Sequence, residues 1–519
     1  MTREMARQPS LFAALHVGSE QVSAQIMEYK SLEDMRVLDR VARQVYLGEE
    51  TFKNGRISFG TVAEFCDLLK GCRRMFSEYG VRDYRLLATT AIREAENQQY
   101  IIDQIQIKTG FSVEVVDMPQ EIFYKYAALF KTLDQAGFTR GNNGMLFVDI
   151  SSGGLGITLY QEGAIQYQQN IHIGALRIKE SFEKQQKDSL HFQQALSEYI
   201  FSTIEPVQEA LQHHSIQYLV LSGTETRLLL DMLGKGQEEQ VTVIHPQEFR
   251  ELYDQVKNLN LSQLIKKFAL SEEWAEMVLP TIVLYKHILE LISIEKILLP
   301  NAHFIDGMSL VYIAEKTKNP WMQMLEGQTV SLAKSLGIKY KYDAKHAACV
   351  EKTALQIFDR MSRIHGMGER ERLQLQVAAI LHDIGKYVSL RKHYYYSHSL
   401  IESSDIMGFS EEEKTVIANV AYYHSKGTPS NLNSNFARLS NEDKIKVAKL
   451  AAIIRLADAL DRTHKQKALD CDIVLKGEEL IIRVTSREDY SLEEWTFLDK
   501  ADFFEDVFGV KAQLIRQVG

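Results

Sequence analysis

The sequence predicts a chain of several domains: an α/β module of two lobes, then an all-α domain, then a small α+β domain. Its 519 residues are too many for a single hydrophobic core. Apolar segments of strand length alternate with helical segments as far as about residue 320, and helical periodicity then dominates as far as residue 464. We expect the domain bounds to be 1–135, 136–320, 321–465 and 466–519.

Short apolar runs bounded by glycine and other turn residues predict the strands of the first lobe. These strands are expected at 11–17, 22–27, 84–90 and 113–116. Apolar residues at helical spacing predict helices at 61–79 and 119–130.

The second lobe is predicted in the same way. A buried strand at 145–150 and a returning strand at 157–160 form a hairpin, and a further strand is expected at 218–221. A buried helix followed by a strand occupies 279–299. The strand–turn–strand pattern with Gly18 resembles the one with Gly153, which indicates two related lobes.

The end of the chain returns to mixed structure. A hairpin over 472–485 turns at Gly477 and Glu478, and a helix at 492–508 and a strand at 510–515 follow. These elements predict the small α+β domain.

Composition excludes several classes of function. A net charge of −9 gives no basic footprint for duplex nucleic acid. No run of 18 apolar residues predicts a membrane span, and the N-terminus lacks the core of a signal peptide. The four cysteines form no CxxC pair and are expected to be reduced thiols, so we expect a cytoplasmic protein. The sequence leaves a homodimer open.

The helical domain places polar residues where apolar ones should face a core. Asp458 continues the stripe of Leu450 and Ile454, and His346 begins the stripe of Val350. Burying such groups without partners costs several kcal/mol, roughly, and a shared cation removes that cost. Imidazole and carboxylate ligands suit Mn, Fe, Ni, Zn or, less well, Mg. The candidate metal ligands are His346, His382, Asp383, His398, His424 and Asp458.

The segment His382-Asp383-Ile384-Gly385-Lys386 resembles the signature of the HD phosphohydrolase superfamily. The resemblance implies that His346, His382, Asp383 and Asp458 hold one divalent metal. It also implies that His398 and His424 lie where binuclear members have extra histidines. Lys386 either binds a substrate phosphate or is a surface lysine after a helix-ending glycine.

A second resemblance covers almost the whole chain. The stretch Ala-Thr-Thr-Ala-Ile-Arg-Glu-Ala-Glu-Asn at 88–97 resembles a motif of the exopolyphosphatase/guanosine pentaphosphate phosphatase (Ppx/GppA) family. Further matches follow at 120–122, 148–150, 172–177, 222–224 and 459–464. The resemblance implies a two-lobed actin-like (ASKHA) fold with a cleft. It also implies hydrolysis of the phosphoanhydride ends of polyphosphate or guanosine pentaphosphate, usually with Mg²⁺.

The same resemblance implies roles for residues of the cleft. Catalytic roles fall to Glu121, Asp149 and Arg93, as a carboxylate that activates water and groups that offset developing charge. Turns that let backbone N–H groups approach phosphate would use Gly18, Ser19, Ser151, Ser152, Gly153, Gly223 and Thr224.

This cleft departs from the family pattern. His16 stands where the family has a metal-coordinating aspartate, and Glu20 places a negative charge on the phosphate path. Leu155 and Gly156 replace a hydroxyl and a carboxylate. We therefore expect weak or absent turnover in the N-terminal cleft.

Three hypotheses remain open. The chain is an exopolyphosphatase-like enzyme working in its N-terminal cleft, an HD-type metal phosphohydrolase whose N-terminal lobes bind a phosphorylated ligand, or a non-catalytic sensor of polyphosphate or guanosine polyphosphate. The family resemblance favours the first hypothesis, whereas the HD constellation, which is the intact one, favours the second.

Overall fold

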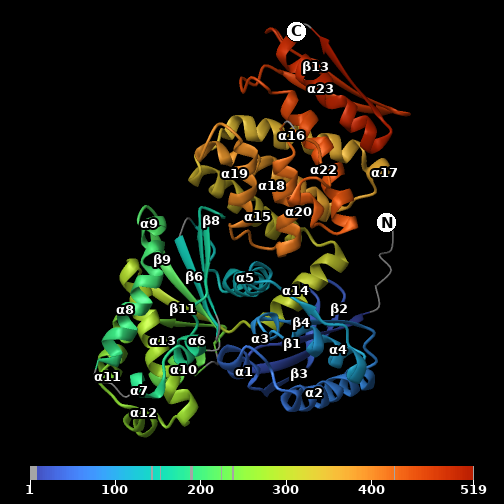
Figure 1. The fold of residues 1–519 in the computed structure, drawn as a ribbon. Helices are drawn as coiled ribbons and strands as arrows, with labels where there is room; N and C mark the ends of the chain where they lie inside the picture. Colours follow the sequence, from blue (N-terminus) through green and yellow to red (C-terminus); the bar gives the residue numbers. More distant parts are fainter. Residues whose placement is uncertain are drawn as a thin grey trace, which may run out of the picture. The chain divides into compact units, whose positions relative to one another are not determined.

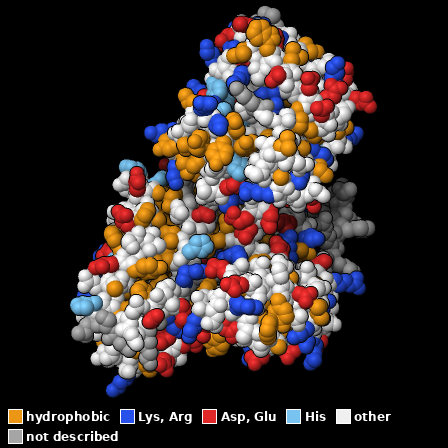
Figure 2. Space-filling view, viewed as in Figure 1, with side chains coloured by type: hydrophobic (Ala, Val, Ile, Leu, Met, Phe, Trp, Pro, Cys, Tyr) orange, Lys and Arg blue, Asp and Glu red, His pale blue; other side chains and the backbone are white. Residues whose placement is uncertain are grey.

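The computed structural model describes residues 9–141, 144–151, 154–187, 191–223, 225–236, 239–425 and 427–517. The chain divides into two compact units, Met1–Leu325 and Glu326–Gly519. Within the described ranges, no helix has both the length and the apolar character that a membrane crossing requires. On the face drawn in Figure 2, acidic and basic side chains are interspersed.

The first lobe of unit 1 contains a five-stranded sheet in the order β3-β2-β1-β4-β5 (Figure 1). Its strands are β1 (Ser10–Val17), β2 (Gln21–Tyr29), β3 (Met35–Gln44), β4 (Asp83–Ala88) and β5 (Glu114–Val115). Its helices are α1 (Leu47–Asn54), α2 (Phe59–Glu78), α3 (Thr90–Arg93), α4 (Gln98–Thr109) and α5 (Met118–Gln135).

The second lobe contains a six-stranded sheet in the order β10-β11-β9-β6-β7-β8. Its strands are β6 (Gly144–Ile150), β7 (Leu155–Gln161), β8 (Ala164–Ile171), β9 (Ile216–Ser222), β10 (Val241–Ile244) and β11 (Lys296–Pro300). The helices are α6 (Ala175–Glu180), α7 (Lys184–Lys187), α8 (Phe192–Ile204), α9 (Pro206–Leu211), α10 (Glu225–Leu233), α11 (Pro246–Val256), α12 (Leu261–Phe268), α13 (Glu272–Leu291) and α14 (Phe304–Thr317).

The two sheets repeat one topology. In each, three consecutive strands form an antiparallel meander, and the next strand pairs parallel with the first strand of that meander. The predicted relation between the lobes is therefore confirmed, as are the predicted hairpins. Strand β3 was not predicted, because most of its residues are exposed and its sequence lacks the buried apolar run of its neighbours.

Side chains alternate between the two faces of a strand, so every second residue of β1 faces α14 and every second residue of β6 faces α5. Phe12 of β1 stacks on Tyr312 of α14, with ring centroids 3.7 Å apart. Phe147 of β6 packs edge-on against Tyr126 of α5. Further along the same faces lie His16, four residues after Phe12 on β1, and Asp149, two residues after Phe147 on β6. Both lie at the ends of their strands, where a cleft opens.

Unit 2 is helical and ends in a three-stranded sheet. Its helices are α15 (Pro320–Lys339), which begins at the end of unit 1, α16 (Ala344–Arg360), α17 (Ser362–His365), α18 (Glu369–Leu381), the 3₁₀ turn η1 (Ile384–Tyr387), α19 (His393–Glu402), α20 (Glu411–Tyr422), α21 (Ser434–Ala437) and α22 (Asn441–Ala459). The C-terminal elements are β12 (Asp470–Lys476), β13 (Glu479–Thr485), α23 (Ser491–Phe508) and β14 (Lys511–Gln517).

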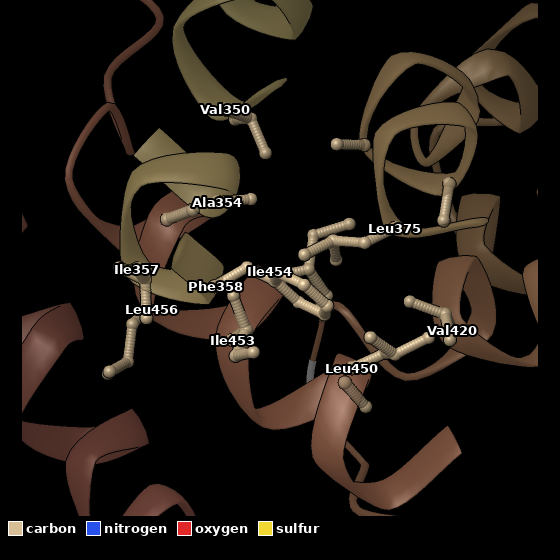
Figure 3. Packing of buried hydrophobic residues seen from close by; sticks show 14 of the residues in the cluster. Val350, Ala354, Ile357, Phe358, Leu375, Val420, Leu450, Ile453, Ile454 and Leu456 are labelled. Atoms are coloured by element: carbon tan, nitrogen blue, oxygen red, sulfur yellow. The ribbon is translucent and has the colours of Figure 1, made fainter. Parts of the chain in front are cut away.

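One hydrophobic cluster runs through unit 2. Side chains of α16, α18, α20 and α22 point toward one another in its helical part (Figure 3). Apolar residues of β13 and α23 belong to the same cluster. Val350 and Ile454 are fully buried members, as their stripes predict. This packing holds the start of α16 and the end of α22 in fixed positions relative to each other.

Helix α22 offers a matched test of this core. Ile454 is fully buried, whereas Ile445 on the same helix is 57% exposed. Ile454→Ala should lower the free energy of unfolding by about 2–5 kcal/mol, and Ile445→Ala should change it by about 0.5 kcal/mol or less. Urea unfolding followed by far-ultraviolet circular dichroism measures both. Equal losses in the two variants would show that α22 does not pack through the predicted stripe.

Candidate functional site

Helix ends in unit 2 bring six ligand-type side chains together. His346 lies in the first turn of α16, Asp458 in the last turn of α22, and His393 at the start of α19. His382 and Asp383 follow α18, and His424 follows α20. All are buried except His393, which is partly exposed. Ligand-type residues with this burial need polar or charged partners close by.

The first group surrounds one carboxylate oxygen of Asp383. Its Oδ2 atom lies 3.8 Å from Nε2 of His346 and 3.6 Å from Nε2 of His382. Asp458 closes this group, because its Oδ1 atom lies 3.4 Å from Nε2 of His346 and 3.9 Å from Nε2 of His382. The sequence predicted these four residues as a set, and the structure brings all four together.

The second group surrounds the other oxygen of the same carboxylate. Oδ1 of Asp383 lies 3.5 Å from Nε2 of His393 and 3.6 Å from Nε2 of His424. Within each group, the Asp383 oxygen and the two imidazole nitrogens lie close enough to share one ion. Asp383 thus belongs to both groups, with one carboxylate oxygen facing each.

The four imidazoles all turn the same nitrogen toward the centre. Each Nδ1 atom lies near an oxygen that can only accept a hydrogen bond: 2.9 Å for His346 to Asp461, and 2.7, 3.3 and 2.5 Å to backbone carbonyls for His382, His393 and His424. In the neutral form of each imidazole, Nδ1 therefore carries the proton and Nε2 presents a lone pair. Fixing the tautomer in this way is how proteins prepare histidine to bind metal.

The lone pairs face one another in two close pairs. Nε2 of His346 and Nε2 of His382 are 3.2 Å apart, and so are Nε2 of His393 and Nε2 of His424. Two imidazole lone pairs repel at this distance unless a proton or a cation lies between them.

The pKa values of these histidines diverge. Burial disfavours the charged form of His346, but hydrogen bonds to Asp458 and Asp461 outweigh it and raise the pKa of His346 to about 9. A proton on His346 can therefore lie between the Nε2 atoms of His346 and His382 when no metal is bound. Burial lowers the pKa of His424 to about 3, so this imidazole is in the neutral form that binds metals.

Charged residues hold the carboxylates from outside. Lys500, from α23, places its Nζ atom 2.5 Å from Oδ2 of Asp458 and is itself buried. Lys386 places Nζ 2.5 Å from Oδ2 of Asp383, and its side chain is 34% exposed. His464 stacks on His346 with ring centroids 3.6 Å apart. Lys386 therefore marks the side of the site that solvent can reach.

His393 takes the place for which the sequence indicated His398. Nδ1 of His398 lies 3.4 Å from Glu402, one turn further along α19, and among the described residues it belongs to neither group. Residues five apart on a helix point about 140° apart, so His393 and His398 cannot both face the centre. Helical phase is the signal that separates them.

Sequence reasoning also missed Asp461 and Lys500. Asp461 was visible in the segment after Asp458, three residues on, where a helical residue can reach the same side. Lys500 is more than 40 positions away in sequence and carried no signal.

The donor set in unit 2 fits divalent metal. Four neutral-capable imidazoles and two carboxylates, oriented as above, are ligands that Mn, Fe, Ni and Zn accept. The bridging position of Asp383 is suited to a pair of ions.

The predicted N-terminal cleft is a cavity of about 300 Å³ in unit 1. Glu121 and Asp149 line it together with the predicted phosphate-binding residues Gly18, Ser19, Ser151 and Gly223. Arg93 lies behind Glu121, with Nη1 3.4 Å from its carboxylate and 2.7 Å from the carbonyl of Val116. Ser152, Gly153 and Thr224 lie outside the described residues.

Gly223 has a structural reason to be glycine. Its φ is +113°, and a Cβ atom there would lie 1.7 Å from the carbonyl oxygen of Ile150. Any other residue would push β9 away from the end of β6. This requirement is independent of phosphate binding.

A lysine that the sequence analysis did not single out lies at the centre of this cleft. Nζ of Lys125 is 2.5 Å from Oδ2 of Asp149 and 3.0 Å from Oε1 of Glu121. Burial raises the pKa of Glu121, but Lys125 and then Arg93 outweigh burial and lower it to about 2. Burial lowers the pKa of His16 to about 4, so His16 is neutral here.

Comparison with known proteins places the chain among phosphatases. The model of the Ppx/GppA phosphatase family matches residues 25–310, and that of Ppx/GppA phosphatase, domain III, matches residues 330–502. A guanosine-5'-triphosphate,3'-diphosphate pyrophosphatase of Vibrio vulnificus (strain YJ016) is 21% identical over 476 residues, 90% of each chain. One of Aliivibrio fischeri (strain MJ11) is 21% identical over 510 residues, 93% of this chain and 95% of that protein.

Solved structures share the fold. An exopolyphosphatase from Cytophaga hutchinsonii gives a TM-score of 0.53 at 19% identity, over 59% of this chain and 98% of that one. A Ppx/GppA family member from Aquifex aeolicus gives 0.50 at 19% identity, over 60% and 99%. The predicted two-lobed fold of the family is thus supported. Because the family model spans more than half of the sequence, this chain belongs to the Ppx/GppA phosphatase family.

Proposed function

We propose that this protein is a metal-dependent phosphohydrolase whose catalytic centre is an HD-type site in unit 2. The main support for this proposal is the position of the Asp383 carboxylate. One of its oxygens faces the imidazoles of His346 and His382, and the other faces those of His393 and His424. A buried carboxylate with imidazole nitrogens oriented toward both of its oxygens is suited to bind a pair of cations, and it would be costly in a protein core without them.

The site has the parts that phosphate hydrolysis needs. Divalent cations held there would polarise a phosphoryl oxygen and lower the pKa of bound water. Lys386 is at the solvent-accessible side and can turn its ammonium from Asp383 to a substrate phosphate. Lys500 and Asp461 keep Asp458 and His346 in place.

The substrate class follows from the family. Relatives carry the names guanosine-5'-triphosphate,3'-diphosphate pyrophosphatase and exopolyphosphatase, so we propose a phosphoanhydride of polyphosphate or guanosine polyphosphate. Nucleotides are the alternative, because HD-type centres require only a phosphoryl group that can reach the ions. We further propose that the two lobes of unit 1 are separate domains, whereas the C-terminal elements share one hydrophobic cluster with the helices of unit 2.

The N-terminal lobes have the second role in this proposal. Their cleft keeps a cavity of about 300 Å³ but has lost the family's carboxylate at the position of His16. We propose that it binds a phosphorylated ligand and does not turn it over.

Metal content separates the two groups of ligands. We expect about two Mn²⁺ ions per chain in the wild type, about one in His393→Ala, and none in Asp383→Ala, because Asp383 belongs to both groups. Removing the ions with a chelator should lower the melting temperature of the wild type and leave that of Asp383→Ala unchanged. Elemental analysis and melting curves measure these quantities.

His398→Ala is the matched control for this series, since His398 lies on the same helix as His393 and contacts Glu402 instead. It should retain both ions. Loss of an ion in His398→Ala, with full occupancy in His393→Ala, would refute the assignment of the second group.

Activity should depend on the same carboxylate. Asp383→Asn keeps the shape of the side chain but removes its charge, so hydrolysis of polyphosphate, guanosine pentaphosphate or nucleotides should fall by roughly 10²-fold or more. Phosphate release from each substrate, with and without Mn²⁺, is the measurement. Hydrolysis that survives Asp383→Asn but is lost in Glu121→Gln would place catalysis in the N-terminal cleft and contradict the proposal.

A further inference from the structure

Lys125 occupies the point on which the two carboxylates of the N-terminal cleft converge. Its Nζ atom lies between Glu121, at 3.0 Å, and Asp149, at 2.5 Å. Its side chain is only 15% exposed, and those of Glu121 and Asp149 are 8% and 13% exposed. Both carboxylates are residues that the family resemblance assigns to a site usually served by Mg²⁺.

The secondary structure fixes Lys125 in this place. Lys125 lies four residues after Glu121 on α5, so the two side chains are on one face of the helix. Asp149 lies two residues after Phe147 on β6, on the sheet face that α5 covers. The packing of Tyr126 on Phe147 sets the separation of α5 and β6, and hence places the ammonium against Asp149.

The remaining lone pairs of these carboxylates also have partners. Oδ1 of Asp149 accepts a hydrogen bond of 2.7 Å from the hydroxyl of Ser222. Oε2 of Glu121 lies 3.4 Å from the guanidinium of Arg93. The four charges, two negative and two positive, balance one another, and each of the four side chains is at most 15% exposed.

A divalent cation does not fit this arrangement. Mg²⁺ requires oxygens at about 2.1 Å in a near-octahedral set, and here a single ammonium, which cannot coordinate it, lies between both carboxylates. In unit 2, by contrast, Lys386 and Lys500 each contact one Oδ2 atom and leave Oδ1 of Asp383 and of Asp458 facing imidazole nitrogens. Burial lowers the pKa of Lys125, but Asp149 and Glu121 outweigh burial and raise it, so the ammonium keeps its proton. A second cation beside it would be repelled.

We infer that Lys125 is a built-in substitute for the metal ion of the N-terminal cleft, and that this cleft excludes divalent cations. Any anion that binds there meets a fixed ammonium and needs no Mg²⁺. The inference is independent of the proposed HD centre, because it concerns other residues in the other unit.

The test is a Mn²⁺ titration, followed by electron paramagnetic resonance, in the full chain carrying Asp383→Ala to remove the ions of unit 2. With Lys125 intact, no ion should depend on Glu121. Adding Lys125→Met, which keeps the length of the side chain but not its charge, should create a site for about one Mn²⁺ per chain. Lys125→Arg, the matched control, keeps the positive charge and should create none.

Two results would overturn the inference. One is a Mn²⁺ ion bound with Lys125 intact and lost on adding Glu121→Gln. The other is a folded Lys125→Met chain that gains no ion. If Lys125→Met fails to fold even with Mn²⁺, the first comparison still decides, because it uses only chains that contain Lys125.

Failure of the proposed HD centre gives a different signal. In that case Asp383→Ala would not change the metal content of the wild type, and the Glu121-dependent difference would still be measured.

Discussion

A carboxylate removed from water must be met by positive charge, and both units of this chain are organised around that constraint. In unit 1, Glu121 and Asp149 are met by the ammonium of Lys125 and the guanidinium of Arg93. In unit 2, the ammonium of Lys386 contacts Oδ2 of Asp383, and imidazoles around the same carboxylate present nitrogens that can bind a cation. Protein side chains alone balance the charges of the first cluster, whereas the donor atoms of the second cluster are suited to added cations.

In the proposed function, this difference gives the two units different roles. The fold of the Ppx/GppA family supplies a two-lobed cleft, and here the lysine on α5 takes the central position of that cleft. The helix ends of unit 2 supply a centre with the ligand types of a metal enzyme. The C-terminal helix α23 contributes Lys500 to that centre, so in the proposed function its packing on α22 helps to hold Asp458 in place.

Much of this organisation was predictable from sequence. The repeated hairpins of β1 with β2 and β6 with β7 follow from apolar runs around glycine, and the inward stripes of α16 and α22 place His346 and Asp458 correctly. Such predictions succeed because burial has a period in sequence. Strand β3 escaped because it is largely exposed. Lys125 was not predicted, because only tertiary packing distinguishes a lysine enclosed in a cleft from the common lysine on a surface.

The histidines show where sequence reasoning needs geometry. His393 and His398 are both plausible from sequence, and the rotation of α19 about its axis decides between them. The orientation of each imidazole depends on hydrogen bonds to backbone carbonyls or to Asp461, and no sequence motif predicts these hydrogen bonds. Residue types could therefore be predicted, but the division of ligands into two groups around one carboxylate could not.

The most direct measurement is a crystal structure of the full chain grown with Mn²⁺, with anomalous diffraction recorded at the manganese edge. We expect two anomalous peaks, one on each side of the Asp383 carboxylate, and none between Glu121 and Asp149. A peak between Glu121 and Asp149, with none beside Asp383, would contradict it.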